Sequence, residues 1–293
     1  MANFRRSSLL PGALLWVQLI AVALLLPTPA VGAEQQGQAS AGTRGQVAAA
    51  PATTESQREA GALLKGMADY LAGLKSFSVT FRAGYDVVQS TGQKIEFGET
   101  RHVALSRPDR LSVEEVASDG KRDRVVFDGR NVSVLDADND VYAQAPQSGT
   151  VDDALAYFVR ELRMRMPLAL LLTTRLPDVL AGSVKTIDYV ESTEILGVAT
   201  HHVAGRTDKV DFQFWIKEGK SPLPLRVVIT YRHSPGEPQF WANFADWNTS
   251  PQFSNATFEF KPPPGAQQIP FAVQVRRSAE ADQQPTANGE IEP

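Results

Sequence analysis

The side chains best suited to chemistry are four histidines, and their spacing does not assemble a site. His201 and His202 are adjacent in a segment that alternates like a β-strand, so they point to opposite faces and cannot hold one metal ion together. His102 and His233 have no nearby carboxylate at a spacing that metal ligands use. We therefore expect no metal site and interpret the histidines as polar residues of the surface or the core.

The sequence also lacks the patterns of nucleophilic and phosphate chemistry. It has no Gly-x-Ser-x-Gly elbow and no glycine-rich phosphate loop. The absence of cysteine excludes disulfides, thiolate metal sites and a cysteine nucleophile. The acidic pairs Glu114-Glu115 and Asp152-Asp153 are typical of a solvated strand and of a helix start. We therefore predict neither an enzyme nor a cofactor; a pH-dependent turnover lost on changing one His or Asp would reverse that prediction.

Composition and charge narrow the class of protein further. The 293 residues are 43% hydrophobic and 21% charged, a balance that supports a sizeable folded core. The length permits one large domain or two small ones. The chain has 29 basic and 33 acidic residues, a net charge of −4. Because a nucleic-acid binder would carry a basic excess or stripe, we expect no nucleic-acid partner.

Residues 1–33 have the pattern of a signal peptide. Arg5 and Arg6 precede an apolar run over Leu9–Leu26, and small residues follow it up to a cleavage position after Ala33. The alternative is an uncleaved membrane anchor, because the run is about as long as the roughly 20 residues that span a bilayer. No later stretch is comparably apolar. We predict export to the periplasm, with no integral membrane segment after cleavage.

The remaining chain divides into two polar ends and one patterned middle. Residues 34–54 contain almost no large apolar side chains and are predicted to be a flexible tether, and residues 276–293 are predicted to be a disordered tail. Residues 55–275 carry strong patterning without an internal repeat. We interpret them as one domain.

The first half of this domain combines one helix with a run of strands. Apolar residues at spacings of three and four predict a helix over Glu55–Leu74, with Thr53 or Thr54 as its N-cap. Alternating residues then predict about six antiparallel strands, since Asp119-Gly120 and Asp128-Gly129 are strong hairpin signals.

The second half begins with helices and returns to strands. Helical segments are predicted to start at Val151 and Pro167, a short turn is predicted at Pro177–Leu180, and strands resume over 184–247. This order predicts an α+β fold: one strongly curved antiparallel sheet with helices covering its concave face.

A sheet of this length has to cover its concave face, either with helices that plug it or around a cavity for a ligand. The apolar side chains expected there suit both a plain core and a lipid groove, because pocket walls are mostly apolar. Both interpretations stay open for the candidate cavity residues, which are Phe77, Val79, Phe81, Leu111, Val113, Phe158, Leu162, Phe212, Phe214 and Phe240.

Two groups of residues carry a resemblance to known families. The hairpin over 127–136, followed by Val141-Tyr142, resembles the Asp-Gly hairpin of the outer-membrane lipoprotein carriers, the LolA family. A family of predicted periplasmic proteins of unknown function is similar over roughly residues 55–270. The stretches that carry this similarity include Gly149–Leu155, Met166–Ala169, Phe214–Ile216, Pro222–Arg226, Val228–Tyr231 and Asp246–Asn248.

The wider superfamily includes LolA, the LppX lipid carriers and the sensor RseB, and the resemblance implies its architecture. That architecture is an incomplete β-barrel with helices across its open side and a hydrophobic cavity between them. The implied function is non-enzymatic periplasmic binding of a lipid, an acyl chain or a lipoprotein. The alternative is an RseB-like sensor or interaction module with a periplasmic or membrane protein as its partner.

Overall fold

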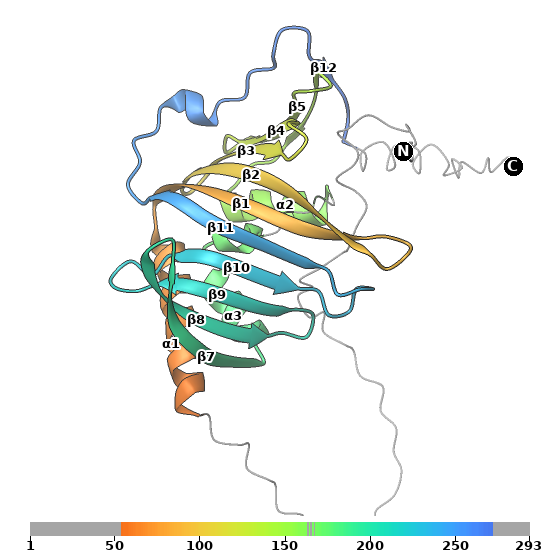
Figure 1. Cartoon of the computed structure of the whole chain (residues 1–293). Helices are drawn as coiled ribbons and strands as arrows, with labels where there is room; N and C mark the ends of the chain where they lie inside the picture. Colours follow the sequence, from red (N-terminus) through yellow and green to blue (C-terminus); the bar gives the residue numbers. More distant parts are fainter. Residues whose placement is uncertain (1–53, 163, 165, 167, 272–293) are drawn as a thin grey trace, which may run out of the picture.

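The computed structural model describes residues 54–162, 164, 166 and 168–271 (Figure 1). In this part of the chain, one twelve-stranded sheet and three α-helices form an α+β fold, which confirms the predicted class. The predicted signal peptide at 1–33, residues 34–53 of the predicted tether and the predicted tail at 276–293 lie outside the described residues. Within the described ranges, no helix is long and apolar enough to cross a membrane.

Helix α1 (Glu55–Gly73) begins with a capping box. The backbone N–H of Gln57 donates to the Thr54 hydroxyl at 3.2 Å, and the Thr54 N–H donates to the Gln57 side chain at 3.0 Å. Thr54 is therefore the N-cap. An apolar stripe runs along the helix and is buried against the sheet; it consists of Ala60, Leu64, Met67, Ala68 and Leu71.

Six antiparallel strands follow α1 in sequence order, as the alternating pattern predicts. The Asp119-Gly120 turn joins the third strand to the fourth and Asp128-Gly129 joins the fourth to the fifth, with a positive φ at both glycines. The strands are β1 (Ser76–Val88), β2 (Lys94–Ser106), β3 (Arg110–Ala117), β4 (Arg122–Phe127), β5 (Asn131–Asp136) and β6 (Val141–Pro146).

The later strands extend the sheet on the other side of β1. They are β7 (Thr186–Ile195), β8 (Val198–Arg206), β9 (Asp211–Lys217), β10 (Pro224–Thr230) and β11 (Gln239–Asn248). The order across the sheet is β12-β6-β5-β4-β3-β2-β1-β11-β10-β9-β8-β7, so β1 pairs with both β2 and β11. The sheet is open, with β7 at one edge. At the other edge β12 (Gln267–Gln268) pairs in parallel with β6, a pairing that the sequence does not predict.

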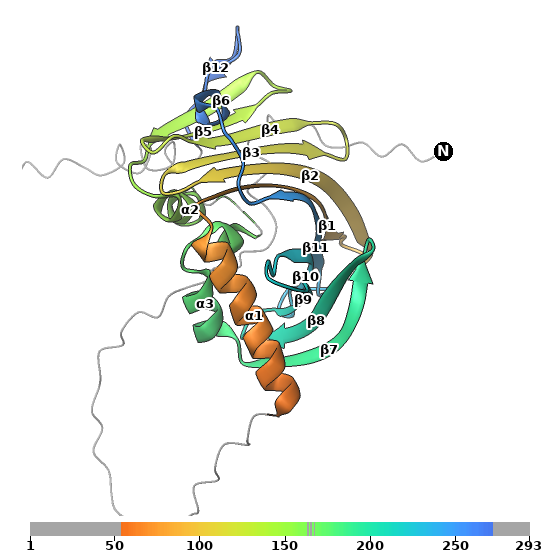
Figure 2. The ribbon, with the colours of Figure 1, turned by 90° about the vertical axis from the view of Figure 1, so that its left-hand side faces the viewer.

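The strand order explains where the helices lie. Because β6 is near one edge and β7 forms the other, the residues between them have to cross the full width of the sheet. They cross it as α2 (Val151–Arg160), a short 3-10 helix η2 (Ala169–Leu172) and α3 (Leu176–Ser183). All three α-helices lie on the same side of the sheet (Figure 2). The segment predicted as a helix from Pro167 is thus only the 3-10 helix η2, and the short turn predicted at Pro177–Leu180 is helix α3.

The hydrophobic core lies between these helices and the sheet face that they cover, which we call the inner face. The opposite, outer face carries a smaller apolar cluster, with Val126, Leu135 and Phe258 buried outside the main core. Phe258 belongs to the 3-10 helix η3 (Asn255–Phe258) in the segment after β11. Arg124 of β4 donates to the Thr257 carbonyl at 3.1 Å, which holds this segment against the outer face.

Candidate functional site

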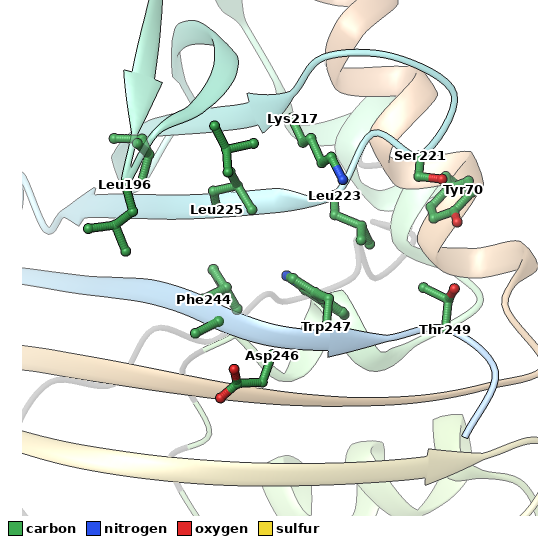
Figure 3. A pocket seen from close by; sticks show the side chains of 13 residues that line it. Tyr70, Leu196, Lys217, Ser221, Leu223, Leu225, Phe244, Asp246, Trp247 and Thr249 are labelled. Carbon is green, nitrogen blue, oxygen red and sulfur yellow. The ribbon is translucent and has the colours of Figure 1, made fainter. Parts of the chain in front are cut away.

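The candidate site is a hollow of about 380 Å³ at one end of the sheet, which we call the groove. It lies where β9 and β11 end and β10 begins, beside α1 and the tip of the β7–β8 hairpin (Figure 3). Its size falls within the range of small-molecule sites. The lining residues are Tyr70, Ile195, Leu196, Val198, Lys217, Ser221, Leu223, Leu225, Phe244, Ala245, Asp246, Trp247 and Thr249.

The groove opens because β10 and β11 separate toward this end of the sheet. Their last paired residues are Arg226 and Asn243. Just beyond, Asp246 has a φ of 51°, and the register of β11 against β1 shifts at this point. The register between β10 and β9 is also irregular, at Leu225. Irregularities of this kind bend a strand away from its neighbour, so a gap forms between the two strands.

Two aromatic side chains form the wall between the groove and the core. The indole N–H of Trp247 donates to the Pro224 carbonyl at 3.0 Å, which ties the separated strands together. The Trp247 ring lies 5.5 Å from the ring of Phe77, and the Phe244 ring lies 5.4 Å from that of Phe81. Two of the candidate cavity residues, Phe77 and Phe81, are therefore core residues that contact this wall.

The rim of the groove carries an unusual leucine. Leu196 is 88% exposed at the tip of the β7–β8 hairpin and has a φ of 51°, followed by Gly197 with a φ of 77°. Hairpin turns with two positive φ values usually begin with Asn, Asp or Gly. A leucine there is both conformationally disfavoured and exposed to water, and it lies beside an apolar hollow (Figure 3).

The ten candidate cavity residues are all buried and belong to one core cluster on the inner face. They come from β1, β3, β9, β11 and the α2 region, and the fold brings them together in the hydrophobic core. Their role as ligand contacts stays a prediction. None of them lines the groove. Val79 lines a second hollow of about 550 Å³, which reaches polar residues of the outer face such as His102, Glu114 and Arg124.

No motif in the sequence marks the groove residues as a site. Phe244 and Trp247 fall in a predicted strand, where aromatic residues are ordinary. The groove depends on how two strands separate, and no single strand's pattern shows that. One available signal is Leu196-Gly197, since a bulky residue stands there in the place of the usual Asn or Asp of a tight hairpin.

A buried ion cluster lies on the inner face of β2 and β3, away from the groove lining. Arg101 is 6% exposed and contacts Glu99 at 2.8 Å and Glu115 at 3.0 Å. Burial raises the pKa of Glu115 to about 8, although Arg101 favours its ionised form.

The histidines are distributed as polar residues of the sheet. His202 stacks on Trp215 with ring centroids 4.0 Å apart, whereas the ring of its neighbour His201 lies 5.9 Å from that of Tyr189. His102 forms a 3.0 Å hydrogen bond with the Thr80 hydroxyl. Among the described residues, no three ligand side chains gather in a way that could hold a metal ion.

Residues 60–272 match the sequence model of the family described as predicted periplasmic protein (DUF2092), and the chain belongs to this family. No curated protein matches the chain.

Several solved structures are similar in fold. Mycobacterium tuberculosis lipoprotein LppX is 18% identical, with 67% of this chain and 99% of that chain covered and a TM-score of 0.42. An uncharacterized conserved protein from Thermus thermophilus is 10% identical, with 72% and 99% covered and a TM-score of 0.42. A LolA superfamily protein from Nitrosomonas europaea is 9% identical, with 69% and 97% covered and a TM-score of 0.35.

Proposed function

We propose that this chain is a non-enzymatic periplasmic protein that binds the acyl chain of a lipid or lipoprotein in the groove. The observation that carries the proposal is a hollow of about 380 Å³ that is lined by both apolar and polar side chains, backed by the core and bordered by the exposed Leu196. Leu223, Leu225, Phe244 and Trp247 supply most of its apolar wall.

The energetics of such a site follow from apolar burial. Each methylene group that leaves water contributes about 0.8 kcal/mol, so a chain needs no polar partner to be retained. The groove accommodates part of a long acyl chain within its present volume. Entry of a longer segment would require Phe244 and Trp247 to move aside, which would bring the chain to Phe77 and Phe81 behind them.

The half-barrel shape belongs to the same proposal. In a half-barrel, the acyl chain would lie between the inner face of the sheet and the helices that cover this face. The ten candidate cavity residues would contact the far end of the chain. The path from β6 to β7 supports this arrangement, because it places α2, η2 and α3 over the inner face. Export through the predicted signal peptide, with cleavage after Ala33, completes the proposal and agrees with the description of the family as periplasmic.

The proposal is tested by measuring uptake of radiolabelled palmitate by purified wild-type protein and by Leu225→Glu. A carboxylate in the groove would have to lose its hydration when the chain binds, so we expect uptake to fall about tenfold or more. The matched control is Val190→Glu, since Val190 is 49% exposed on β7 and does not line the groove. Its uptake should equal that of the wild type.

Leu225→Glu is informative only if it folds, which its circular dichroism and melting curve report. Leu196→Glu provides a second variant at an 88% exposed position, where folding should tolerate the charge. Equal uptake by wild type, both groove variants and the control would overturn the groove as the binding site. Absence of uptake by the wild type would overturn acyl binding itself.

A further inference from the structure

Polar and apolar side chains are sorted along the groove. Lys217, Ser221, Tyr70 and Thr249 lie toward the end beside α1 (Figure 3). Leu225, Leu196 and Phe244 lie toward the opposite end, with Leu223 and Trp247 between the two groups (Figure 3). A purely apolar ligand would gain nothing from the polar end. A ligand with one polar head and one apolar tail matches both ends at once.

The charge at the polar end is positive and uncompensated. Lys217 is exposed. It forms no ion pair with any residue that the structure describes, a property that it shares with Lys75, Lys209 and Lys220; among these four lysines, it is the one that lines the groove. The adjacent Glu218 is directed instead to Ser192 and His201. Asp246 is the acidic residue of the groove lining, and its carboxylate lies on the far side of β11 from the Lys217 ammonium group (Figure 3).

Three hydroxyl groups line the same end of the groove as Lys217 (Figure 3). In the described part of the chain, the hydroxyl groups of Tyr70, Ser221 and Thr249 have no hydrogen-bond partner within the protein, so all three can donate to a ligand oxygen. The Trp247 indole N–H, in contrast, is committed to the Pro224 carbonyl. One ammonium group and three hydroxyls at the end of an apolar channel complement an anionic head group that accepts several hydrogen bonds.

From this arrangement we infer that the groove binds a single-chain amphiphile with an anionic head, a carboxylate or a phosphate monoester. The head group lies against Lys217 and the hydroxyls, and the tail runs past Leu225 and Phe244 toward Leu196. This inference rests on the proposed function and specifies its ligand class. The specificity resides in the head group, because the apolar end accepts any chain of suitable length.

The test compares two probes of equal chain length, palmitate and hexadecanol, as competitors of the uncharged fluorophore N-phenyl-1-naphthylamine. Palmitate is anionic near neutral pH, and hexadecanol is uncharged. We expect Lys217→Gln to weaken palmitate binding about five- to tenfold, since a charge-assisted hydrogen bond is lost from a partly solvated site. Hexadecanol binding should change less than twofold. Lys217→Arg keeps the positive charge and should bind palmitate with nearly the wild-type affinity. Lys220→Gln changes an exposed lysine outside the groove lining, and its palmitate affinity should equal that of the wild type.

The outcomes separate the two proposals. Equal palmitate affinity for wild type and Lys217→Gln, with both probes still bound, overturns the anionic head group and leaves acyl binding standing. An equal loss of affinity for palmitate and hexadecanol in Lys217→Gln also overturns the anionic head group, because the lysine would then act through the shape of the groove. Failure of both probes to displace the fluorophore from the wild type overturns acyl binding itself. If acetate or inorganic phosphate, which have no acyl tail, displaced the fluorophore as well as palmitate does, the ligand would be a free anion. That result would overturn the proposal of an amphiphile.

Discussion

Leu196 occupies a backbone conformation in which most side chains are disfavoured. The left-handed region brings Cβ close to the following carbonyl oxygen and costs about 1–2 kcal/mol for an ordinary residue. Asn and Gly adopt it more readily, and the adjacent Gly197 has the φ of 77° that the second turn position requires. The hairpin would therefore be more stable without the leucine, which is consistent with a role for its side chain in ligand binding.

We predict that Leu196→Asn raises the free energy of unfolding by about 1 kcal/mol, because Asn tolerates a positive φ. The same substitution should lower palmitate uptake severalfold, because an apolar side chain at the rim is lost. Urea unfolding and the uptake assay measure the two effects on one sample. If the variant is no more stable than the wild type and takes up palmitate normally, Leu196 has no role in acyl binding.

A second residue-scale prediction concerns Glu115. Its folded-state pKa of about 8 lies above the ordinary value of 4.5, so the folded protein retains a proton that the unfolded chain has released between these two values. Raising the pH through this window therefore favours unfolding. We expect the free energy of unfolding to fall by about 3 kcal/mol from pH 5 to pH 8 through this group.

Glu115→Gln removes the titrating group and should flatten this decline. The measurement is urea unfolding of both proteins at intervals between pH 5 and pH 8. Equal slopes in the two proteins would mean that burial of Glu115 beside Arg101 does not set the pH dependence of stability.

At the scale of elements, the sequence predicts the helices and turns that local residue patterns determine. The three- and four-residue spacing of Leu64, Met67 and Leu71 predicts α1, and Asp119-Gly120 and Asp128-Gly129 predict two of the hairpin turns. These signals work because each depends on residues close together in the chain.

Features that depend on distant residues escape this kind of prediction. The pairing of β1 with β11 joins residues more than 150 positions apart, such as Phe81 and Phe244, and no local pattern encodes it. The parallel pairing of β12 with β6 rests on two residues, Gln267 and Gln268. The groove belongs to this second group of features, because it arises only after β10 and β11 are paired and then separate.

The sequence does not predict the groove, and none of the ten candidate cavity residues lines it. The ten candidate residues were chosen as apolar positions of helices and strands, and the structure gathers them in the core, where such positions normally lie. The groove residues Leu196, Leu225 and Lys217 stand at strand ends and turns, where the hydrophobic pattern carries little information.

At the scale of the whole molecule, the topology places the groove at the edge of the hydrophobic core. The connection from β6 to β7 carries the helices over the inner face, and the segment after β11 returns over the outer face to β6. The groove lies at the end of the sheet, beside the β7–β8 hairpin and α1 (Figure 3).

Native mass spectrometry of the mature protein isolated from periplasm tests the central claim most directly. Lipid analysis of the same sample after denaturation would follow. We expect an adduct of one ligand molecule per protein molecule, which is released on denaturation. The ligand should contain a single acyl chain with a carboxylate or phosphate head group. A bare protein mass, with no adduct formed after incubation with palmitate, would contradict acyl binding and leave the groove without a ligand.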